Sequence, residues 1–527
     1  MTTLRPPSQQ PSPAPGAVTA CGNPGVRDAP CGKRESGVLV VVSTSARTLV
    51  QAAHRAGLAV RAVDAFGDVD TVARAQRWQR VALGPGGGLD AGAVLHALDD
   101  HGPAPAKVVL GSGLEASLDA IEQLAARHVL VGNHPSVWRV AHDPGLWFAL
   151  ARSLGLPTPA IRHADPTDPE AWLLKRAGSS GGQHVQAVTS RASADARASG
   201  AWYYQRRIAG EAHSLLFLAN GRDIRTVGFN RTLPAPPEAA TPWVWAGAVR
   251  PAGLPMALCA RVEAAALALT VALGLRGLNG LDLIVQGDAW FLLELNPRPT
   301  ATLDLWDVEP MPPLFDLHLR ACAGELPDLP RHQPLHQWPH QWPHQSPQSP
   351  QSPQSPQAGP ALSPLRALPS PPGARAMAVV YAGQPLHVPF DAAWPAACRD
   401  RPRAGLRLQP GEPLCTLHAT HSTARGAAAK VDKLRQQLLL NLGCAASGST
   451  TVSTAASSTA ATATTTSTAS ANTANTSTTR PLPLPLPATA PGCSVALAES
   501  ATPATAASTA AAGPAWCDGV QARFQAS

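Results

Sequence analysis

Residues 277–304 constrain the fold more than any other part of this 527-residue chain. Two apolar, strand-like runs, 280–285 and 289–295, flank the short polar segment 286–288. Apolar runs joined by a segment that contains glycine are typical of a β-hairpin. The stretch therefore predicts two adjacent antiparallel strands.

Polar side chains of this hairpin share one parity, and strand residues of equal parity lie on one face. They are Asp282, Glu294, Asn296 and Arg298, whereas the leucines at 281, 283, 293 and 295 are predicted to form the packed side. Carboxylate and amide oxygens suit Mg²⁺ and its phosphates, and an arginine can hold a phosphoryl oxygen. The alternative is an ordinary hairpin whose polar face is simply exposed to solvent. An apolar strand that ends in Leu-Leu-Glu-Leu-Asn-Pro-Arg is unusual in such a hairpin.

This pattern resembles the metal-binding end of an ATP-grasp domain, which carries an acid on one strand and Glu-x-Asn-x-Arg about a dozen residues later. Asp282 matches the acid, and residues 294–298 match the second motif. The resemblance implies that Asp282, Glu294 and Asn296 bind Mg²⁺ or Mn²⁺, and that Arg298 stabilises the transferred phosphoryl group. Asp304 would be a further acid near the acceptor or, as we favour, a solvated residue at a helix start.

A glycine-rich segment upstream extends the resemblance. Residues 171–175 are strand-like, and Lys175 at their end would hold phosphate oxygens. Glycine permits turns in which backbone N–H groups face phosphate. The residues that would cover the nucleotide phosphates are Gly178, Ser179, Ser180, Gly181 and Gly182. The helix predicted within 143–159 has Asp143-Pro144 where the family usually has Asp-Lys, which removes one expected cation.

Residues 202–218 resemble the connection between the two ATP-grasp lobes, where backbone groups hold adenine. By position, the backbone of Arg207 and Ile208 would meet adenine, and the ribose candidates are Gln205, Glu211 and His213. For each single residue, a solvated surface position is an equally good interpretation.

Strands that alternate with helices over residues 37–135 predict a small parallel α/β domain. A helix is expected at 43–57, capped by Ser43, Thr44 or Ser45 and ended by Gly57. Gly-Ser-Gly at 111–113 follows a predicted strand, a place where such sheets bind ligands, although a plain tight turn explains it equally well.

Composition divides the rest of the chain. We expect the fold class to be α/β plus α+β, with a two-lobed ATP-grasp module and a small C-terminal α+β lobe. The predicted segments are 1–36 disordered, 37–135 α/β domain, 136–330 ATP-grasp domain, 331–375 Pro/Gln linker, 376–442 C-terminal lobe and 443–527 disordered Thr/Ala/Ser-rich tail.

Net charge, cysteine content and hydropathy limit the classes of partner that the chain is expected to bind. The net charge is +7 without a Lys/Arg run, so nucleic acid is not expected. The nine cysteines form no CxxC pair, which fits a reduced, cytoplasmic setting. No secretory signal and no apolar run of about 18 residues is visible, so no membrane partner is expected.

The resemblance implies an ATP- and Mg²⁺-dependent, ADP-forming ligase that activates a carboxylate as an acyl phosphate for attack by an amine. The partners would be these two small molecules, and a homo-oligomer is compatible with the sequence. Uncharacterised ATP-grasp relatives of biotin carboxylase imply a role in making a pterin- or furan-type one-carbon carrier. The alternatives are a carboxylase that acts through carboxyphosphate, for which no Met-Lys-Met carrier segment is present, and a catalytically silent nucleotide-binding protein.

Overall fold

A computed structural model describes residues 38–84, 87–100, 105–190, 192, 201–327, 368 and 370–443, and all of them belong to one compact unit. The segments expected to be disordered, 1–36 and all but the first residue of 443–527, lie outside the described residues. The same holds for the predicted linker up to residue 367.

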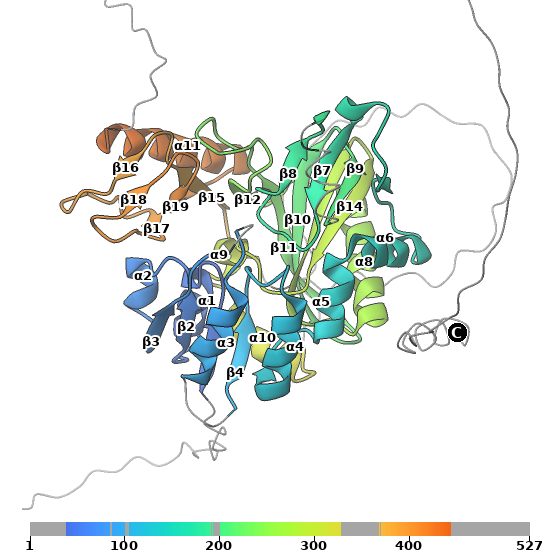
Figure 1. The fold of residues 1–527 in the computed structure, drawn as a ribbon, viewed down its shortest axis with the longest axis horizontal. Helices are drawn as coiled ribbons and strands as arrows, with labels where there is room; N and C mark the ends of the chain where they lie inside the picture. Colours follow the sequence, from blue (N-terminus) through green and yellow to red (C-terminus); the bar gives the residue numbers. More distant parts are fainter. Residues whose placement is uncertain are drawn as a thin grey trace, which may run out of the picture. The chain divides into compact units, whose positions relative to one another are not determined.

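A five-stranded parallel sheet opens the described chain, as the alternation of strands and helices predicts (Figure 1). Its strand order is β3-β2-β1-β4-β5. The strands are β1 (Leu39–Val42), β2 (Arg61–Asp64), β3 (Arg77–Arg80), β4 (Lys107–Leu110) and β5 (Val129–Leu130). The helices are α1 (Arg47–Arg55), α2 (Val69–Val72), α3 (Ala91–Asp99) and α4 (Leu118–Arg127). Buried valines and leucines on both faces of β1 and β4 hold this layer together.

The start of α1 differs from the expectation. The N-cap is Ala46, whose N–H donates to Asp64 Oδ2 at 3.1 Å, so none of the three predicted hydroxyls caps the helix. Two of these hydroxyls are engaged elsewhere, since Thr44 donates to the carbonyl of Ser112 and Ser45 to Asp400. The predicted end is confirmed, because Gly57 has a φ of 70° directly after the helix.

A four-stranded antiparallel sheet forms the next layer, in the order β6-β9-β7-β8. Its strands are β6 (Ile161–Arg162), β7 (Trp172–Arg176), β8 (Val185–Ala187) and β9 (Trp202–Arg206), and a 3-10 turn, η1 (Pro169–Ala171), precedes β7. Two helices connect it to the parallel sheet, α5 (Pro135–His142) and α6 (Pro144–Ser153).

The largest sheet has eight strands in the order β14-β13-β10-β11-β12-β15-β19-β17, and all its pairs are antiparallel. Its strands are β10 (Glu211–Asn220), β11 (Ile224–Thr232), β12 (Gly247–Arg250), β13 (Arg276–Gln286), β14 (Ala289–Asn296), β15 (Ala374–Tyr381), β17 (Cys398–Arg399) and β19 (Pro413–His421). The sheet therefore runs on from the predicted ATP-grasp module into the predicted C-terminal lobe. Because β15 begins at Ala374, the last residues of the predicted linker are ordered.

Helices cover this sheet, and a small ribbon completes the C-terminal part. The helices are α8 (Met256–Leu273), α9 (Leu303–Trp306), α10 (Leu314–Cys322) and α11 (Ala424–Asn441), and the ribbon is β16 (Leu386–His387) with β18 (Arg407–Leu408). α11 packs against the C-terminal strands through one face, since Val431 and Leu438 are buried.

α8 is a described helix that is long and apolar enough to cross a membrane, by length and composition alone. The same properties suit a core helix. Leu258, Val262 and Leu269 on α8 are buried in the cluster that also contains Leu215 and Phe217 of β10. α8 also contains a charged residue, Arg261, whose side chain donates to the carbonyl of Asp288.

Candidate active site

The predicted hairpin is present as β13 and β14, with Gly287 in the turn at a φ of 58°. Asp282 lies directly opposite Glu294, and Asn296 Nδ2 donates to Asp282 Oδ2 at 2.9 Å. The three proposed oxygen ligands thus meet at one end of the hairpin.

The packed side of the hairpin departs from the prediction at one residue. The pairing shifts just after Asp282, so that Leu283 lies opposite Leu292 and Leu293 is passed over. Such a bulge reverses the parity of the strand beyond it. Leu292 is fully buried in the core where Leu293 was expected, and Leu293 is half-buried.

Lys175 joins the hairpin from the other sheet. Its Nζ lies 3.6 Å from Glu294 Oε2, and it lies opposite Tyr203 in the β7–β9 pair. Burial disfavours the charge on Lys175, but Tyr203 and Glu294 hold the pKa of its ammonium above the ordinary value. The ammonium is therefore retained inside the site. No sequence pattern pointed to Tyr203, because its contact with Lys175 depends on strand register.

The two carboxylates carry more negative charge than their surroundings neutralise. Burial and the neighbouring Glu294 raise the pKa of Asp282 to about 8. Burial opposes the charge on Glu294 as well, but Lys175 and His184 lower the pKa of that carboxyl below its usual range. With no further cation, Asp282 thus keeps a proton at neutral pH. A divalent cation would displace that proton, so the donor set fits Mg²⁺ or Mn²⁺.

The number of acids in the cluster bears on how a metal would be held. Nowhere in the described ranges do three His, Cys, Asp or Glu side chains converge as a metal site. Here only Asp282 and Glu294 are acids, and Asn296 is an amide. Mg²⁺ commonly takes one or two carboxylates together with phosphate oxygens and water. The donor set therefore suits a metal that arrives with a nucleotide.

Two histidines near the carboxylates were not among the predicted site residues. Within the part of the chain that the structure describes, His142 Nε2 and His184 Nδ1 are buried without a hydrogen-bond partner. Burial lowers the pKa of both imidazoles, that of His184 to about 4 with a further contribution from Lys175. The sequence signal that could have identified these histidines is their position, since His184 follows the glycine-rich segment and His142 precedes Asp143-Pro144.

Arg298 is fixed by an acid from the parallel sheet. Its Nε donates to Glu115 Oε1 at 2.9 Å, its Nη2 forms an ion pair with the same oxygen at 2.8 Å, and Nη2 also donates to Asn296 Oδ1 at 3.1 Å. Glu115 Oε2 accepts from the N–H of Gly113 at 2.6 Å. Both side chains of the ion pair are buried, and Arg298 helps to hold the pKa of the Glu115 carboxyl low against its burial. Glu115 therefore positions Arg298 beside the metal ligands, a role that sequence reasoning missed.

Pro144 has a local structural role. It occupies the first turn of α6, where a missing N–H costs nothing, and the Asp143 side chain accepts from the N–H of Leu146 at 3.0 Å. The substitution of the family's usual lysine thus preserves the helix start while it removes a cation.

The glycine-rich loop is packed tightly between two parts of the chain. A Cβ on Gly178 would lie 2.9 Å from Ala116 Cα, and a Cβ on Gly182 would lie 1.9 Å from the carbonyl oxygen of Trp243. Gly181 has a similar positive φ but open space around its Cα, and its carbonyl accepts from the N–H of Trp245. The loop is therefore held near the Glu115 segment and the Lys175 strand.

This difference predicts unequal effects of alanine at two neighbouring positions. Both substitutions place an L side chain at positive φ, which costs about 1–2 kcal/mol. Gly182→Ala also collides with backbone and should lower the free energy of unfolding by roughly 1–3 kcal/mol more than Gly181→Ala. Urea unfolding of both variants measures this, and equal losses would contradict the described packing of the loop.

The connection between the two antiparallel sheets is residues 207–210, where β9 ends and β10 begins. The predicted adenine contacts, Arg207 and Ile208, lie in this connection, and the N–H of Arg207 donates to the carbonyl of Ala171. Gln205 has the same parity as Tyr203, so it lies on the Lys175 face of its sheet, and its Oε1 is buried without a partner among the described residues.

The other two ribose candidates are placed differently. Glu211 is exposed, and His213 is buried, with its Nδ1 3.1 Å from the carbonyl of Glu211. Their register partners on β13 are Val285 and Leu283, whereas Asp282 pairs with Ser214. Glu211 and His213 therefore lie on the face opposite to Asp282, and their role in ribose binding stays a prediction.

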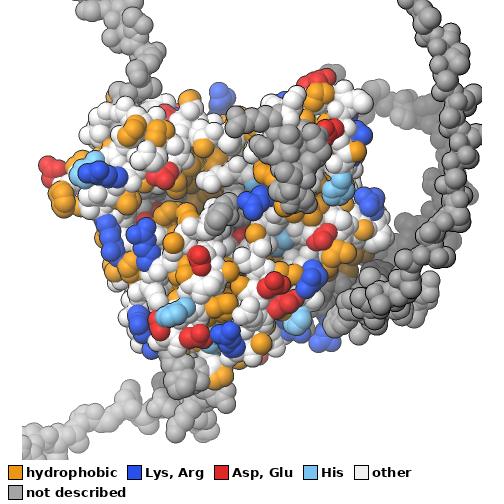
Figure 2. Space-filling view, viewed as in Figure 1, with side chains coloured by type: hydrophobic (Ala, Val, Ile, Leu, Met, Phe, Trp, Pro, Cys, Tyr) orange, Lys and Arg blue, Asp and Glu red, His pale blue; other side chains and the backbone are white. Residues whose placement is uncertain are grey.

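A cavity of about 220 Å³ opens beside Arg298. Its polar wall comes from loops that follow β1, β2 and β4 at the carboxyl ends of the parallel strands, and it includes Gly111 and Ser112 of the Gly-Ser-Gly turn. Its apolar wall comes largely from β15, β18 and β19. Figure 2 shows orange hydrophobic side chains in the hollow between the C-terminal part and the parallel sheet. The end of parallel strands is the usual ligand position in such sheets.

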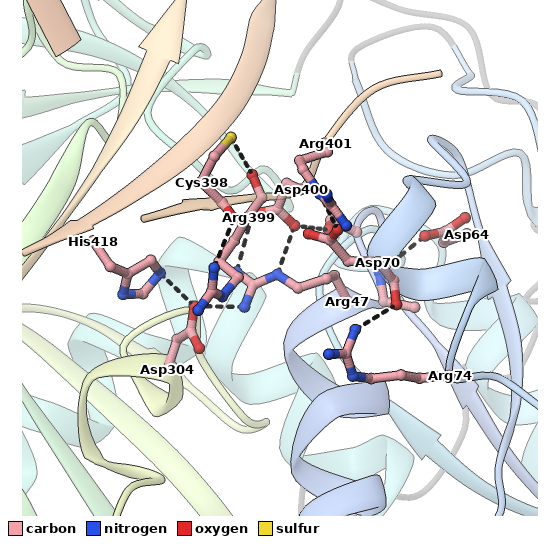
Figure 3. A network of polar contacts seen from close by, with 12 residues as sticks. Arg47, Asp64, Asp70, Arg74, Asp304, Cys398, Arg399, Asp400, Arg401 and His418 are labelled. Atoms are coloured by element: carbon pink, nitrogen blue, oxygen red, sulfur yellow. Dashed lines mark hydrogen bonds and ion pairs between the residues drawn. The ribbon is translucent and has the colours of Figure 1, made fainter. Parts of the chain in front are cut away.

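A buried ion-pair network lies beside this cavity (Figure 3). Arg47 donates to Asp400 through Nε and Nη2, at 2.8 and 3.0 Å, and to Asp304 through Nη1 at 2.5 Å. Asp304 is also paired with His418 at 2.8 Å. The expectation that Asp304 is a solvated helix-start residue is therefore wrong. Asp304 lies in the first turn of α9, but Arg47 and His418 hold the pKa of its buried carboxyl far below the usual range.

The comparisons with known proteins agree with this geometry. A family model described as ATP-grasp domain matches residues 147–302, which include the glycine-rich loop and all four polar residues of the hairpin. Residues 147–302 are an ATP-grasp domain. No curated protein matches the sequence.

Solved structures with ATP-grasp folds resemble the chain over a longer range. One is the biotin carboxylase domain of a single-chain bacterial carboxylase (18% identity, TM-score 0.51, 75% of this chain and 88% of that chain). Another is N5-carboxyaminoimidazole ribonucleotide synthetase from Thermus thermophilus (18%, 0.51, 77% and 98%). A third is the biotin carboxylase domain dimer of Hydrogenobacter thermophilus 2-oxoglutarate carboxylase, in complex with MgADP, ADP and bicarbonate (13%, 0.54, 76% and 90%). At these identities the likeness establishes the fold, which covers the parallel sheet and the C-terminal strands as well as the ATP-grasp domain.

Proposed function

We propose that the chain is an ATP-dependent ligase that converts a carboxylate to an acyl phosphate and then joins it to an amine. The observation that carries this proposal is the position of Arg298. Its guanidinium contacts the proposed metal ligand Asn296, and it also lines the 220 Å³ cavity. One group thus touches both the phosphate region and a space for an organic substrate.

The roles of the side chains follow from their charges. Asp282, Glu294 and Asn296 would hold Mg²⁺ or Mn²⁺, which would neutralise the negative charge of the terminal phosphates of ATP. Lys175 would hold phosphate oxygens from the opposite sheet, and the N–H groups of the glycine-rich loop would cover them. His142 and His184 would add neutral hydrogen-bonding groups near the same carboxylates, because burial lowers the pKa of both, so they do not replace the positive charge lost at Pro144.

The reaction then has two transfers. A substrate carboxylate oxygen attacks the γ-phosphorus of ATP, the bond to ADP breaks, and an acyl phosphate forms. The amine nitrogen attacks the acyl carbon, inorganic phosphate leaves with the electron pair, and the nitrogen loses a proton. Arg298, fixed by Glu115 and Asn296, would stabilise the oxygens of the phosphoryl group in both steps, an effect that commonly supplies a few kcal/mol in a site shielded from water.

A carboxylase that acts through carboxyphosphate is the second candidate, and the likeness to biotin carboxylase domains favours it. Bicarbonate is far smaller than the cavity, whose walls are largely apolar. The cavity therefore favours an organic acceptor. A silent nucleotide-binding protein is the third candidate, and the Pro144 substitution favours it.

ADP release separates these candidates. Full-length protein with Mg·ATP should release ADP only when both a carboxylate and an amine are added. ADP release with bicarbonate alone would support the carboxylase, and no ADP release with any substrate pair would support the silent binder.

Lys175→Ala should weaken Mg·ATP binding about tenfold or more, because it removes a charge-assisted contact from a buried site. Calorimetry measures this, with the exposed Lys433→Ala as control. An unchanged Kd would mean that the glycine-rich loop does not cover the nucleotide.

We further propose a role in one-carbon carrier synthesis, which the family resemblance implies. A cytoplasmic location, a homo-oligomeric state and the six segment boundaries given above complete the proposal.

A further inference from the structure

One acid on the cavity wall has no role in the fold. Asp68 precedes α2, but its side chain accepts no capping hydrogen bond. It is 6% exposed, and its Oδ2 is buried without a partner in the described part of the chain. A buried carboxylate oxygen left without a donor is costly, so its presence on a cavity wall indicates a group that a ligand completes.

The neighbouring acids already have donors. Asp64 accepts from the N–H groups of Ala46 and Gly67 and from Trp78 Nε1, and Asp70 Oδ1 accepts from Arg401 Nε at 2.7 Å (Figure 3). Asp70 Oδ2 is also buried without a partner in the described part of the chain, but Asp70 does not line the cavity. Asp400 accepts from Arg47 and Ser45. Asp68 thus lies among three other carboxylates as a side chain open to a ligand.

The charges around the cavity favour a cation. Two cationic side chains line it, Arg47 and Arg298, and both are neutralised. Arg47 is paired with Asp400 and Asp304, and Arg298 with Glu115. Burial, followed by Asp400 and Asp64, raises the pKa of Asp68 to about 8, which shows the excess of negative charge at this wall.

The apolar walls limit the rest of the ligand. Large hydrophobic side chains from several elements face the cavity, among them Leu49, Phe66, Trp245, Met377, Val379 and Leu414. An engineered apolar cavity of about 150 Å³ holds benzene. At 220 Å³ this cavity has room for an aromatic or branched aliphatic body with a short aminoalkyl arm.

We propose that the cavity binds the amine substrate, that this substrate is a compact apolar primary amine, and that its ammonium group donates to Asp68 Oδ2. This inference rests on the proposed ligase function and names the substrate class of the same site. Asp68 is then a specificity-determining residue, because an anion of the same shape would meet the carboxylates of Asp68 and Asp400 and no unpaired cation among the cavity-lining residues described.

Three ligands of matched shape test the proposal on the full-length protein without ATP: 2-phenylethylamine, 2-phenylethanol and 3-phenylpropionate. Calorimetry at pH 8 should show the amine bound at least about tenfold more tightly than the alcohol, with no binding of the acid. Asp68→Asn should remove the preference for the amine and leave the alcohol affinity unchanged. Asp70→Asn, which removes a charge from the same cluster outside the cavity, should lower the amine affinity much less.

Equal effects of the two substitutions, or tighter binding of the acid, would overturn the proposal. If Asp68→Asn does not fold, the wild type supplies the test by pH. Because Asp68 is protonated below its raised pKa, affinity for the amine should rise from pH 6 to 8, while affinity for the alcohol stays constant. A flat profile for the amine would overturn the proposal. Mg·ATP binding measured in parallel separates the two claims, since lost amine selectivity with intact Mg·ATP binding refutes only the amine assignment.

Discussion

Glu294→Gln should abolish Mg²⁺-dependent turnover and leave the fold intact. Glutamine keeps the shape of the side chain but removes the charge that lies 3.6 Å from Lys175 and directly opposite Asp282. Removal of one preorganised electrostatic group from an active site typically costs about 10²–10³-fold in kcat. Steady-state ADP release, with circular dichroism to confirm the fold, measures the effect.

The same hairpin offers a matched control. Asp288 lies in the exposed turn between β13 and β14, where its backbone carbonyl accepts from Arg261. Asp288→Asn therefore makes the same acid-to-amide change away from the cluster and should leave turnover unchanged. Near-normal turnover of Glu294→Gln would refute its role as a metal ligand.

Arg298→Lys should reduce turnover by about 100-fold although it keeps the positive charge. Arg298 donates one hydrogen bond to Glu115 and one to Asn296 and makes a second ion-pair contact with Glu115, and an ammonium cannot reproduce this planar arrangement. Because Glu115 is buried, the weaker pairing should also lower the free energy of unfolding by about 1–3 kcal/mol. Single-turnover kinetics and urea unfolding measure the two effects separately.

A comparison within the protein separates chemistry from stability. Arg320→Lys on the exposed side of α10, where Arg320 pairs with Glu325, should change neither quantity. If Arg298→Lys is destabilised but turns over at the wild-type rate per folded molecule, then Arg298 holds the parallel sheet to the hairpin and takes no part in phosphoryl transfer.

The site shows which inferences a sequence permits. The hairpin from Asp282 to Arg298 followed from strand parity and a motif of fixed spacing, which depend on local pairing. Lys175 was assigned from the resemblance of its strand and glycine-rich loop to an ATP-grasp domain, although it meets Glu294 from another sheet. The bulge at Leu293 did not, because a bulge is visible only in the register of two strands. Glu115 was also missed, since it lies 183 residues from Arg298 and only the packed fold brings the two together.

The same distinction explains the error at Asp304. An acid at the start of an apolar turn is usually a solvated helix-start residue, and Asp304 does lie in the first turn of α9. Its partners Arg47 and His418 come from α1 and from β19, so its burial depends on three parts of the chain at once. The cavity and Asp68 belong to the same class of feature, because their walls come from segments that no local pattern connects.

Calorimetric titration of full-length protein with Mg·ATP tests the central claim most directly. The wild type should bind with a 1:1 stoichiometry, and the Asp282→Asn/Glu294→Gln double variant should lose at least about tenfold in affinity, because it removes both charges that attract the metal. Equal affinity in wild type and double variant would contradict the assignment of the hairpin as the site of Mg·ATP binding, and with it the proposed ligase.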